Sequence, residues 1–441
     1  MKKFLAAIVV LLIAAGASAP YVSGLVAERE IRDIIAKTNK LYADTAMGFS
    51  AEITQYKRGY SSSEVEWKVN LGSMSSLYGV KEVLLRDQIK HEMTGVVATT
   101  YLDRNPQYQE IIKSKLAGKD PLHITTRYPL TGDYQTTFAF DAFSLAEGEQ
   151  TLNIKPARFV VSCDKDLKHF VMDGAWEGMA VNGMGSLDTV SMKGDMTMES
   201  IYLGSGNVTM VLKGFKIEDP KEPVALANLI VNYNLAYDKA ANKLSAKVEY
   251  GADSINVGDK KVEKALLRVA MNGVNATAYE ELMRVYMAAF NKVVTAAGND
   301  AQDPEQLGQA FEQQMGQIGM QLMGPAEKML TKGLEFQISD VHFTLPEGQV
   351  TGNASVGLAK DMTFAQFVPL VNQPELALQI FTLQSNCSLP KQLLGDDPSF
   401  LEPVHPGMKT GVFVVKGNRA EHKAEIKDGK LLLNNQELPL K

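Results

Sequence analysis

The sequence has few cysteines, no excess of positive charge and only one long uncharged run, and each shortage excludes a class of protein. Two cysteines in 441 residues, Cys163 and Cys387, exclude a small disulfide-stapled scaffold, although an exported chain leaves their pairing open. A net charge of −6 gives no basic footprint, which argues against nucleic acid as a partner. Because no second long uncharged run occurs, we expect at most one membrane span.

Motifs that carry catalysis or metal binding are also missing. The six histidines are scattered and form no His-Glu-x-x-His pair. No Gly-x-Ser-x-Gly elbow, phosphate loop or dinucleotide fingerprint occurs, and Ser205 between two glycines is typical of a turn. We therefore expect a protein that is not an enzyme, with no catalytic, cofactor-binding or metal-binding residues and no cofactor.

The long uncharged run covers residues 4–27, after Lys2 and Lys3. As a helix it measures about 36 Å at about 1.5 Å per residue, enough to cross a hydrocarbon core of about 30 Å. Its Ala-Ser-Ala box resembles a signal-peptide cleavage site, but Pro20 follows the box at once. We favour a retained anchor over the alternative, a cleaved signal.

The two lysines before the run predict the orientation of the chain. Positive charge favours the cytoplasmic side, so the bulk of the chain lies beyond the membrane. We expect a single-pass protein of the bacterial inner membrane, held through residues 4–27, with the rest in the periplasm.

Beyond residue 47 most of the chain alternates apolar and polar residues, as half-buried strands do. Residues 229–237 alternate and are followed by a polar turn at 238–243 and a returning strand at 244–250. Such pairs predict an α+β, mainly β fold: a large curved antiparallel β-sheet meander with a helical-pair insertion and one N-terminal membrane-spanning helix. The expected regions are an anchor at 1–27, an exit helix at 28–47, a β region at 48–275, the helical insertion at 276–332 and a C-terminal β region at 333–441.

The helical insertion has its own start and stop signals. A capping box at Thr277 to Glu280 opens the first helix, a break follows at 298–300, and Asp303-Pro304 opens the second, which we expect to stop at Gly324-Pro325. Four side chains are expected to face the sheet: Leu282, Phe290, Phe311 and Ile318.

Shorter signals predict four further features. They are a helix at 106–116 capped by Asn105, a bulge near Ser339-Asp340, a short helix at 363–371, and a terminal hairpin of 412–415 and 431–440 around a turn at 428–430.

Two features admit a binding role beside a structural one. We expect Gly59 to supply an unusual backbone angle at a hairpin or bulge; the alternative gives Arg58 an acidic lipid headgroup to bind. The 20 methionines are typical of core filler, and alternatively of a pliant apolar groove.

Three short stretches carry a resemblance to a known family: Tyr-Lys-Arg-Gly-Tyr-Ser-Ser at 56–62, Pro-Glu-Gly-Gln-Val-Thr-Gly at 346–352 and Asp-Gly-Lys-Leu-Leu-Leu-Asn-Asn at 428–435. With the N-terminal run they resemble the YdgA-like family of bacterial envelope proteins. The resemblance covers nearly the whole chain and implies a single-span periplasmic protein with a domain of unknown function. It brings no catalytic residues.

We therefore expect a non-enzymatic envelope scaffold or interaction module. The alternative is a lipid-binding or lipid-guiding groove, by fold-level analogy with AsmA-like envelope proteins. The groove requires the apolar faces of strands such as 229–237 to stay partly open. The expected partners are the inner membrane, with lipid or envelope proteins as further candidates.

Overall fold

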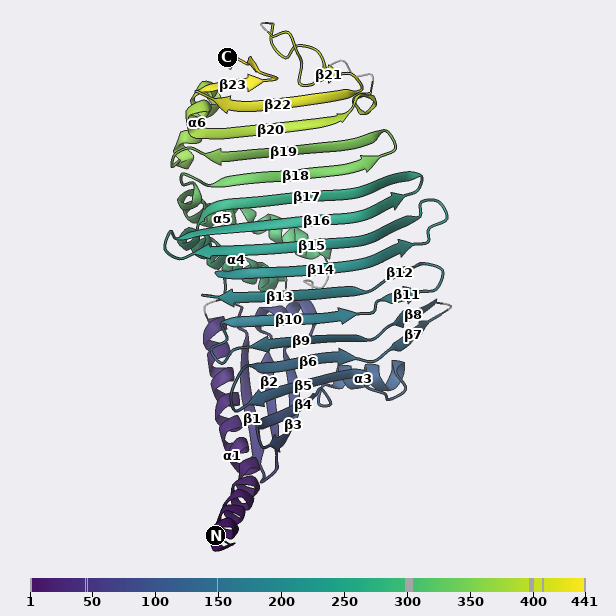
Figure 1. The fold of residues 1–441 in the computed structure, drawn as a ribbon, viewed down its shortest axis with the longest axis vertical. Helices are drawn as coiled ribbons and strands as arrows, with labels where there is room; N and C mark the ends of the chain where they lie inside the picture. Colours follow the sequence, from purple (N-terminus) through teal and green to yellow (C-terminus); the bar gives the residue numbers. More distant parts are fainter. Residues whose placement is uncertain are drawn as a thin grey trace. The chain divides into compact units, whose positions relative to one another are not determined.

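The computed structural model describes residues 2–43, 45, 47–148, 150–297, 304–395, 400–406 and 408–439, with the side chains of the N-terminal helix described from Ser18 onward. The fold is mainly β, with 51% strand and 25% helix. Every strand pair with a described register is antiparallel, which confirms the predicted large antiparallel sheet (Figure 1). The chain divides into two compact units. Unit 1 comprises Met1–Val181, Lys193–Tyr202 and Met283–Met320, and unit 2 comprises Asn182–Met192, Leu203–Leu282 and Gln321–Lys441.

Unit 1 is built on an open sheet with the strand order β1-β2-β3-β4-β5-β6-β9-β10. A side branch pairs β7 with β8 and β8 with β11. The strands are β1 Ser50–Arg58, β2 Ser62–Asn70, β3 Glu82–Glu92, β4 Gly95–Tyr101, β5 Leu122–Pro129, β6 Tyr134–Phe140, β7 Phe143–Glu147, β8 Gln150–Ile154, β9 Ala157–Cys163, β10 His169–Trp176 and β11 Met179–Val181. β13, Val190–Met198, has residues in both units.

The N-terminal helix α1, Lys2–Ala43, packs on one face of β1–β4 (Figure 1). Its small and branched residues recur at helical spacing, so Ala27 and Ile31 are buried together with Val65, Ile89 and further strand side chains. Asn39 fixes the far end of the helix, because its side-chain amide exchanges two 2.8 Å hydrogen bonds with the backbone of Ala51. The expected exit helix is thus the second half of a longer helix.

The expected membrane-spanning helix is not supported by the described part of the chain. Among the described residues, no helix is long and apolar enough to cross a membrane. The most apolar part of the expected span, residues 4–17, lies outside the described side chains. Membrane anchoring through residues 4–27 therefore stays a prediction.

The short helices of unit 1 are η1 Gly72–Met74, α2 Ser75–Tyr78 and α3 Pro106–Lys115. Asn105 is the N-cap residue of α3, as the sequence predicts, but its side chain makes no capping bond. It bonds instead to the backbone of Leu84, accepting from the N–H at 2.9 Å and donating to the carbonyl at 2.7 Å. Asn105 therefore ties the start of α3 to strand β3.

Unit 2 contains antiparallel strands in the order β14-β15-β16-β17-β18-β19-β20-β22-β23-β24. β12 pairs with β14, and β21 pairs with β22. The strands are β12 Gly185–Leu187, β14 Gly204–Ile217, β15 Val224–Asp238, β16 Lys243–Val257, β17 Lys260–Asn275, β18 Glu335–Leu345, β19 Gly348–Leu358, β20 Phe381–Pro390, β21 Val414–Lys416, β22 Arg419–Lys427, β23 Lys430–Leu433 and β24 Gln436–Glu437. The hairpin predicted at 229–250 is confirmed as β15 and β16.

The two expected long helices are α4, Ala276–Ala297, and α5, Pro304–Met329, each with residues in both units. The predicted cap at Thr277 is wrong, because Asn275 accepts the hydrogen bond of the Ala278 N–H at 3.0 Å and so caps the helix at an earlier position. The predicted stop at Gly324-Pro325 is also wrong. The helix continues to Met329, which packs against a buried cluster of Leu203, Leu244, Val274 and Ala276.

Of the four side chains expected to face the sheet, Ile318 is buried, and Leu282, Phe290 and Phe311 are half-buried. The break expected at 298–300 and the helix start expected at Asp303 lie outside the described residues. These two expectations therefore stay predictions.

Shorter helices complete unit 2: η3 Phe364–Gln366, α6 Phe367–Asn372, η4 Pro374–Leu376, α7 Ala377–Ile380 and η5 Lys391–Leu394. The first two confirm the short helix predicted at 363–371, with a capping box between Thr363 and Gln366. The predicted bulge near Ser339-Asp340 is confirmed by a register shift between Ile338 and Val341.

The terminal hairpin differs from its prediction. The strand before the 428–430 turn is β22, because Lys427 pairs with Lys430 across Asp428-Gly429. Both turn residues have positive φ, and so do Asn434 and Asn435 between β23 and β24. These are the two-residue turns whose backbone suits Asn, Asp and Gly. The resemblance motif at 428–435 is therefore two successive tight turns.

Candidate functional site

Three adjacent rows of apolar side chains run across one face of the unit 2 sheet. Cross-strand partners point to the same side of a sheet, so the registers place each row on one face. The first row joins Met210, Val231, Tyr250, Leu267 and Val341; the second joins Val208, Tyr233, Val248, Val269 and Ile338; the third joins Leu235, Ala246, Met271, Phe336 and Val356. None of these residues is charged.

This face of three rows, the apolar face, stays partly open. Four of its side chains, Met210, Tyr250, Phe336 and Val356, are 41%, 44%, 49% and 41% exposed. The remaining members of the rows are half-buried. Exposed apolar side chains gathered on one face are candidates for an interaction site.

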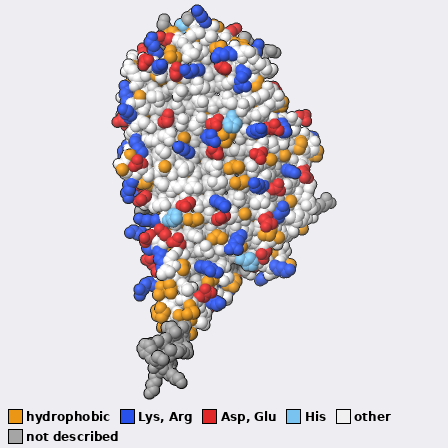
Figure 2. All heavy atoms as spheres, viewed as in Figure 1, with side chains coloured by type: hydrophobic (Ala, Val, Ile, Leu, Met, Phe, Trp, Pro, Cys, Tyr) orange, Lys and Arg blue, Asp and Glu red, His pale blue; other side chains and the backbone are white. Residues whose placement is uncertain are grey.

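The opposite face of the same strands is polar and internally paired. Arg268 forms an ion pair with Glu249 at 2.5 Å and another with Asp340 at 3.2 Å. Asn232 donates to Glu249 at 3.0 Å and accepts from Thr209 at 2.8 Å. The hydrogen bond from Arg268 holds the pKa of Glu249 below its ordinary value. Charges of both signs are likewise interspersed on the face seen in Figure 2.

A polar cleft of about 510 Å³ lies where two of the resemblance motifs meet in unit 2. Thr351 and Gly352 of the motif at 346–352 line it, with Asn434 and Asn435 of the motif at 428–435. Asn434 is committed to structure, because its amide donates to the carbonyls of Gly411 and Val412 at 2.9 and 3.1 Å. Asn434 therefore holds the turn at the edge of the cleft and is not free to bind a ligand there.

The remaining resemblance motif, at residues 56–62, lies beside a buried histidine of unit 1. His91 is 5% exposed; its Nε2 lies 2.8 Å from Ser63 Oγ, and its Nδ1 lies 3.1 Å from the carbonyl of Tyr60. A neutral ring that donates from Nδ1 and accepts at Nε2 satisfies both contacts. Because Ser63 is also buried, at 6% exposure, this serine–histidine pair is a satisfied core contact and not a nucleophile open to substrate.

Gly59 allows a close approach between two backbone segments and does not supply an unusual backbone angle. Its φ is not positive, contrary to the prediction, but a Cβ at this position would lie 2.8 Å from the carbonyl oxygen of Ser62. Arg58 is paired with Glu28 of α1 at 2.8 Å and lies over the ring of Tyr21. The candidate headgroup ligand Arg58 thus has an intramolecular partner.

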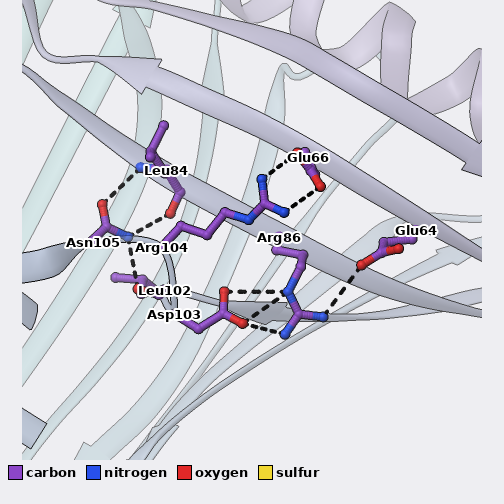
Figure 3. Close-up of polar contacts among 8 residues, drawn as sticks. All are labelled: Glu64, Glu66, Leu84, Arg86, Leu102, Asp103, Arg104 and Asn105. Atoms are coloured by element: carbon purple, nitrogen blue, oxygen red, sulfur yellow. Dashed lines mark hydrogen bonds and ion pairs between the residues drawn. The ribbon is translucent and has the colours of Figure 1, made fainter. Parts of the chain in front are cut away.

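Two more arginines of unit 1 are held in the network shown in Figure 3. Arg86 donates to Asp103 at 2.5 and 3.0 Å and lies 3.7 Å from Glu64. Arg104 binds Glu66 with both of its terminal nitrogens. These pairs fasten the loop before α3 to strands β2 and β3, so both cations serve the fold.

The two cysteines are half-buried thiols in the described part of the chain. Burial raises the pKa of Cys163 to about 12 and also raises that of Cys387, and both thiols are free. A thiol that keeps its proton is a poor nucleophile. No group of three or more metal-ligating side chains occurs in the part of the chain that the structure describes. Ser205 lies inside β14, not in the expected turn.

Asp87 gives a pH-dependent prediction for unit 1. Burial raises the pKa of this carboxyl above its ordinary value near 3.8, opposed by hydrogen bonds that include one from the Trp67 indole at 3.1 Å. The folded state therefore keeps the proton to higher pH than the unfolded state, and stability is lost as pH rises through the folded pKa. We expect Asp87→Asn to remove this loss in urea unfolding measured at a series of pH values. The exposed control Asp253→Asn should leave the decline in place, and an unchanged decline in Asp87→Asn would reject the assignment.

Fold and site together define a mainly β protein with a partly open apolar sheet face in unit 2 and a helix docked on strands β1–β4 of unit 1. A family model described as "Bacterial protein of unknown function (DUF945)" matches residues 1–441. The chain belongs to this bacterial family. Neither a search of the curated proteins nor a search of the solved structures found a match.

The groove hypothesis requires the apolar faces of strands such as 229–237 to stay partly open. This strand is part of the apolar face. The sequence did not indicate which residues remain exposed. The signal available was alternation in successive strands, which gives the face of each residue but not what covers that face.

Proposed function

We propose that the protein is a non-enzymatic protein of the bacterial envelope that binds lipid acyl chains on the apolar face of unit 2. In this proposal the N-terminal helix holds the protein in the inner membrane, and the bulk of the chain lies in the periplasm. The observation that carries the proposal is the set of three uncharged rows, in which Met210, Tyr250, Phe336 and Val356 are each more than two-fifths exposed.

The size of the face suits an acyl chain. The row from Met210 to Val341 crosses five neighbouring strands, β14 to β18. At a strand spacing of about 4.8 Å it extends about 19 Å. One lipid tail extends over about half of a hydrocarbon core of about 30 Å, so a tail fits along a row. Met210, at one of the open positions, has a flexible side chain that adapts to chains of irregular shape.

A binding assay with a fluorescent palmitate tests the proposal. Met210→Lys and Tyr250→Lys place a charge on the apolar face at positions that are 41% and 44% exposed. We expect each to weaken binding about tenfold or more, since tenfold corresponds to about 1.4 kcal/mol and the lost apolar contact is of that order.

The control is Tyr78→Lys, which makes the same change at a 66% exposed tyrosine of unit 1. It should bind the palmitate like the parent protein. Equal binding by all three variants would reject the apolar face as the lipid site. A protein partner bound on the same face would instead support the scaffold hypothesis.

A further inference from the structure

We propose that one end of unit 1 is a membrane-contacting rim formed by three hairpin tips and one turn of α1. The rim consists of six exposed apolar or aromatic residues: Tyr21, Val22, Leu25, Tyr60, Met93 and Leu130. Its partner is the surface of a lipid bilayer. The inference rests on the proposed membrane anchoring and adds a second, shallow contact made by the folded domain itself.

The topology brings the three tips to the same end of the sheet. In an antiparallel sheet of order β1 to β6, the turns after β1, β3 and β5 all lie at one end (Figure 1). Hydrogen bonds join neighbouring tips: His91 N–H donates to Ser61 O, and Leu130 N–H donates to Thr94 O, each at 2.9 Å. Tyr21 of α1 stacks on Tyr60 of the first tip, with ring centroids 6.3 Å apart.

The side chains at these tips are unusual for turns in water. Met93 is 65% exposed and Tyr60 is 57% exposed, although turns are normally polar. Figure 2 shows hydrophobic side chains gathered at the end of the molecule where the described part of α1 begins. Tyrosine is enriched where membrane proteins meet the headgroup region.

The length of α1 argues that a bilayer is the occupant. Ser23, Gly24 and Ala27 are buried on unit 1, so they cannot also lie in lipid. The uncharged part of the helix that is left, residues 4–20, measures about 25 Å, short of a hydrocarbon core of about 30 Å. A short span draws the bilayer surface towards the folded domain. The first part of that domain to be met is the rim.

Charged neighbours set the depth of contact. Glu92 is exposed beside Met93, and Asp133 is exposed beyond Leu130. Lys57 and Lys90 lie on the strands that lead to the first two tips. Because carboxylates do not enter hydrocarbon without cost, the rim rests among the headgroups and inserts only its apolar tips.

Spin labels on the full-length chain in lipid nanodiscs test this placement. In a Cys163→Ser/Cys387→Ser background, labels are attached at Tyr60→Cys and Met93→Cys, with Tyr78→Cys as the matched control. Tyr78 is 66% exposed in α2, which follows β2 and so lies at the opposite end of the sheet. We expect the ratio of oxygen to nickel-complex accessibility to be severalfold higher at the two tip labels than at the control.

Tip labels as accessible to the nickel complex as the control, on a chain that stays in the bilayer through a carbonate wash, would overturn the rim alone. A chain that the wash releases would overturn the anchor and the rim together. Met93→Trp gives a second readout, because brominated lipid should quench its added fluorescence and leave that of Tyr78→Trp unchanged.

Discussion

Replacing Ile89 with alanine is expected to lower the free energy of unfolding by about 2–5 kcal/mol. Ile89 is 1% exposed in the core between α1 and the sheet of unit 1, where it is clustered with Ala27, Val65 and Val96. Truncation leaves a cavity that close-packed neighbours fill only in part. The measurement is urea unfolding in mild detergent, followed by the fluorescence of Trp67, which packs against the same core.

Ile111→Ala is the matched control for this prediction. Ile111 is 51% exposed on α3 of the same unit, so the same truncation should change stability by less than about 0.5 kcal/mol, apart from a small gain in helix propensity. Similar costs for the two variants would contradict the packing of α1 on the sheet.

Gly24→Ala is expected to destabilise the protein by about 1–3 kcal/mol, against the usual preference of helices for alanine. Gly24 lies in α1 directly over His91, and a Cβ there would lie 2.2 Å from Cε1 of the His91 ring. The ring is held by its contacts with Ser63 and Tyr60, so it cannot move aside without losing them. The helix must therefore lift from the sheet.

Two further variants make this prediction specific. Gly319→Ala in α5 meets no atom within 4 Å and should stabilise the helix slightly, by up to about 1 kcal/mol. His91→Ser removes the ring, so Gly24→Ala should cost less in that background than in the parent, a coupling that a double-mutant cycle measures. If Gly24→Ala instead stabilised the protein as Gly319→Ala does, the docking of α1 through His91 would be wrong.

Periodicity carried most of the fold prediction because each signal acts within one or two strands. Alternation at 229–250 predicted β15 and β16, and the change of phase between Ile338 and Val341 predicted a bulge. Asn105 and Thr363 were identified as helix starts by residue type and position alone. These features depend on neighbours in sequence, which a single sequence contains.

The errors arose where distant residues decide the outcome. Pro325 ends helices in isolation, yet α5 passes through it because Met329 gains a place in the core beside Leu244 and Val274. Thr277 matched a capping box, but its hydroxyl donates to Asn242 at 3.2 Å while Asn275 caps the helix. In both cases tertiary contacts override the local signal.

The candidate site was predictable only in outline. Alternation assigns Tyr250 and Phe336 to one face of their strands, but their exposure depends on what packs against that face. The role of His91 was likewise hidden, since its partners Gly24 and Ser63 lie 67 and 28 positions away. No local pattern joins such residues.

Native mass spectrometry of the full-length chain, released gently from bacterial membranes, tests the central claim most directly. We expect a chain that carries an acyl lipid, and we expect Met210→Lys/Tyr250→Lys to lose this lipid while Tyr78→Lys retains it. A chain that carries no lipid, or one whose lipid is unaffected by charges on the apolar face, would contradict the proposed function.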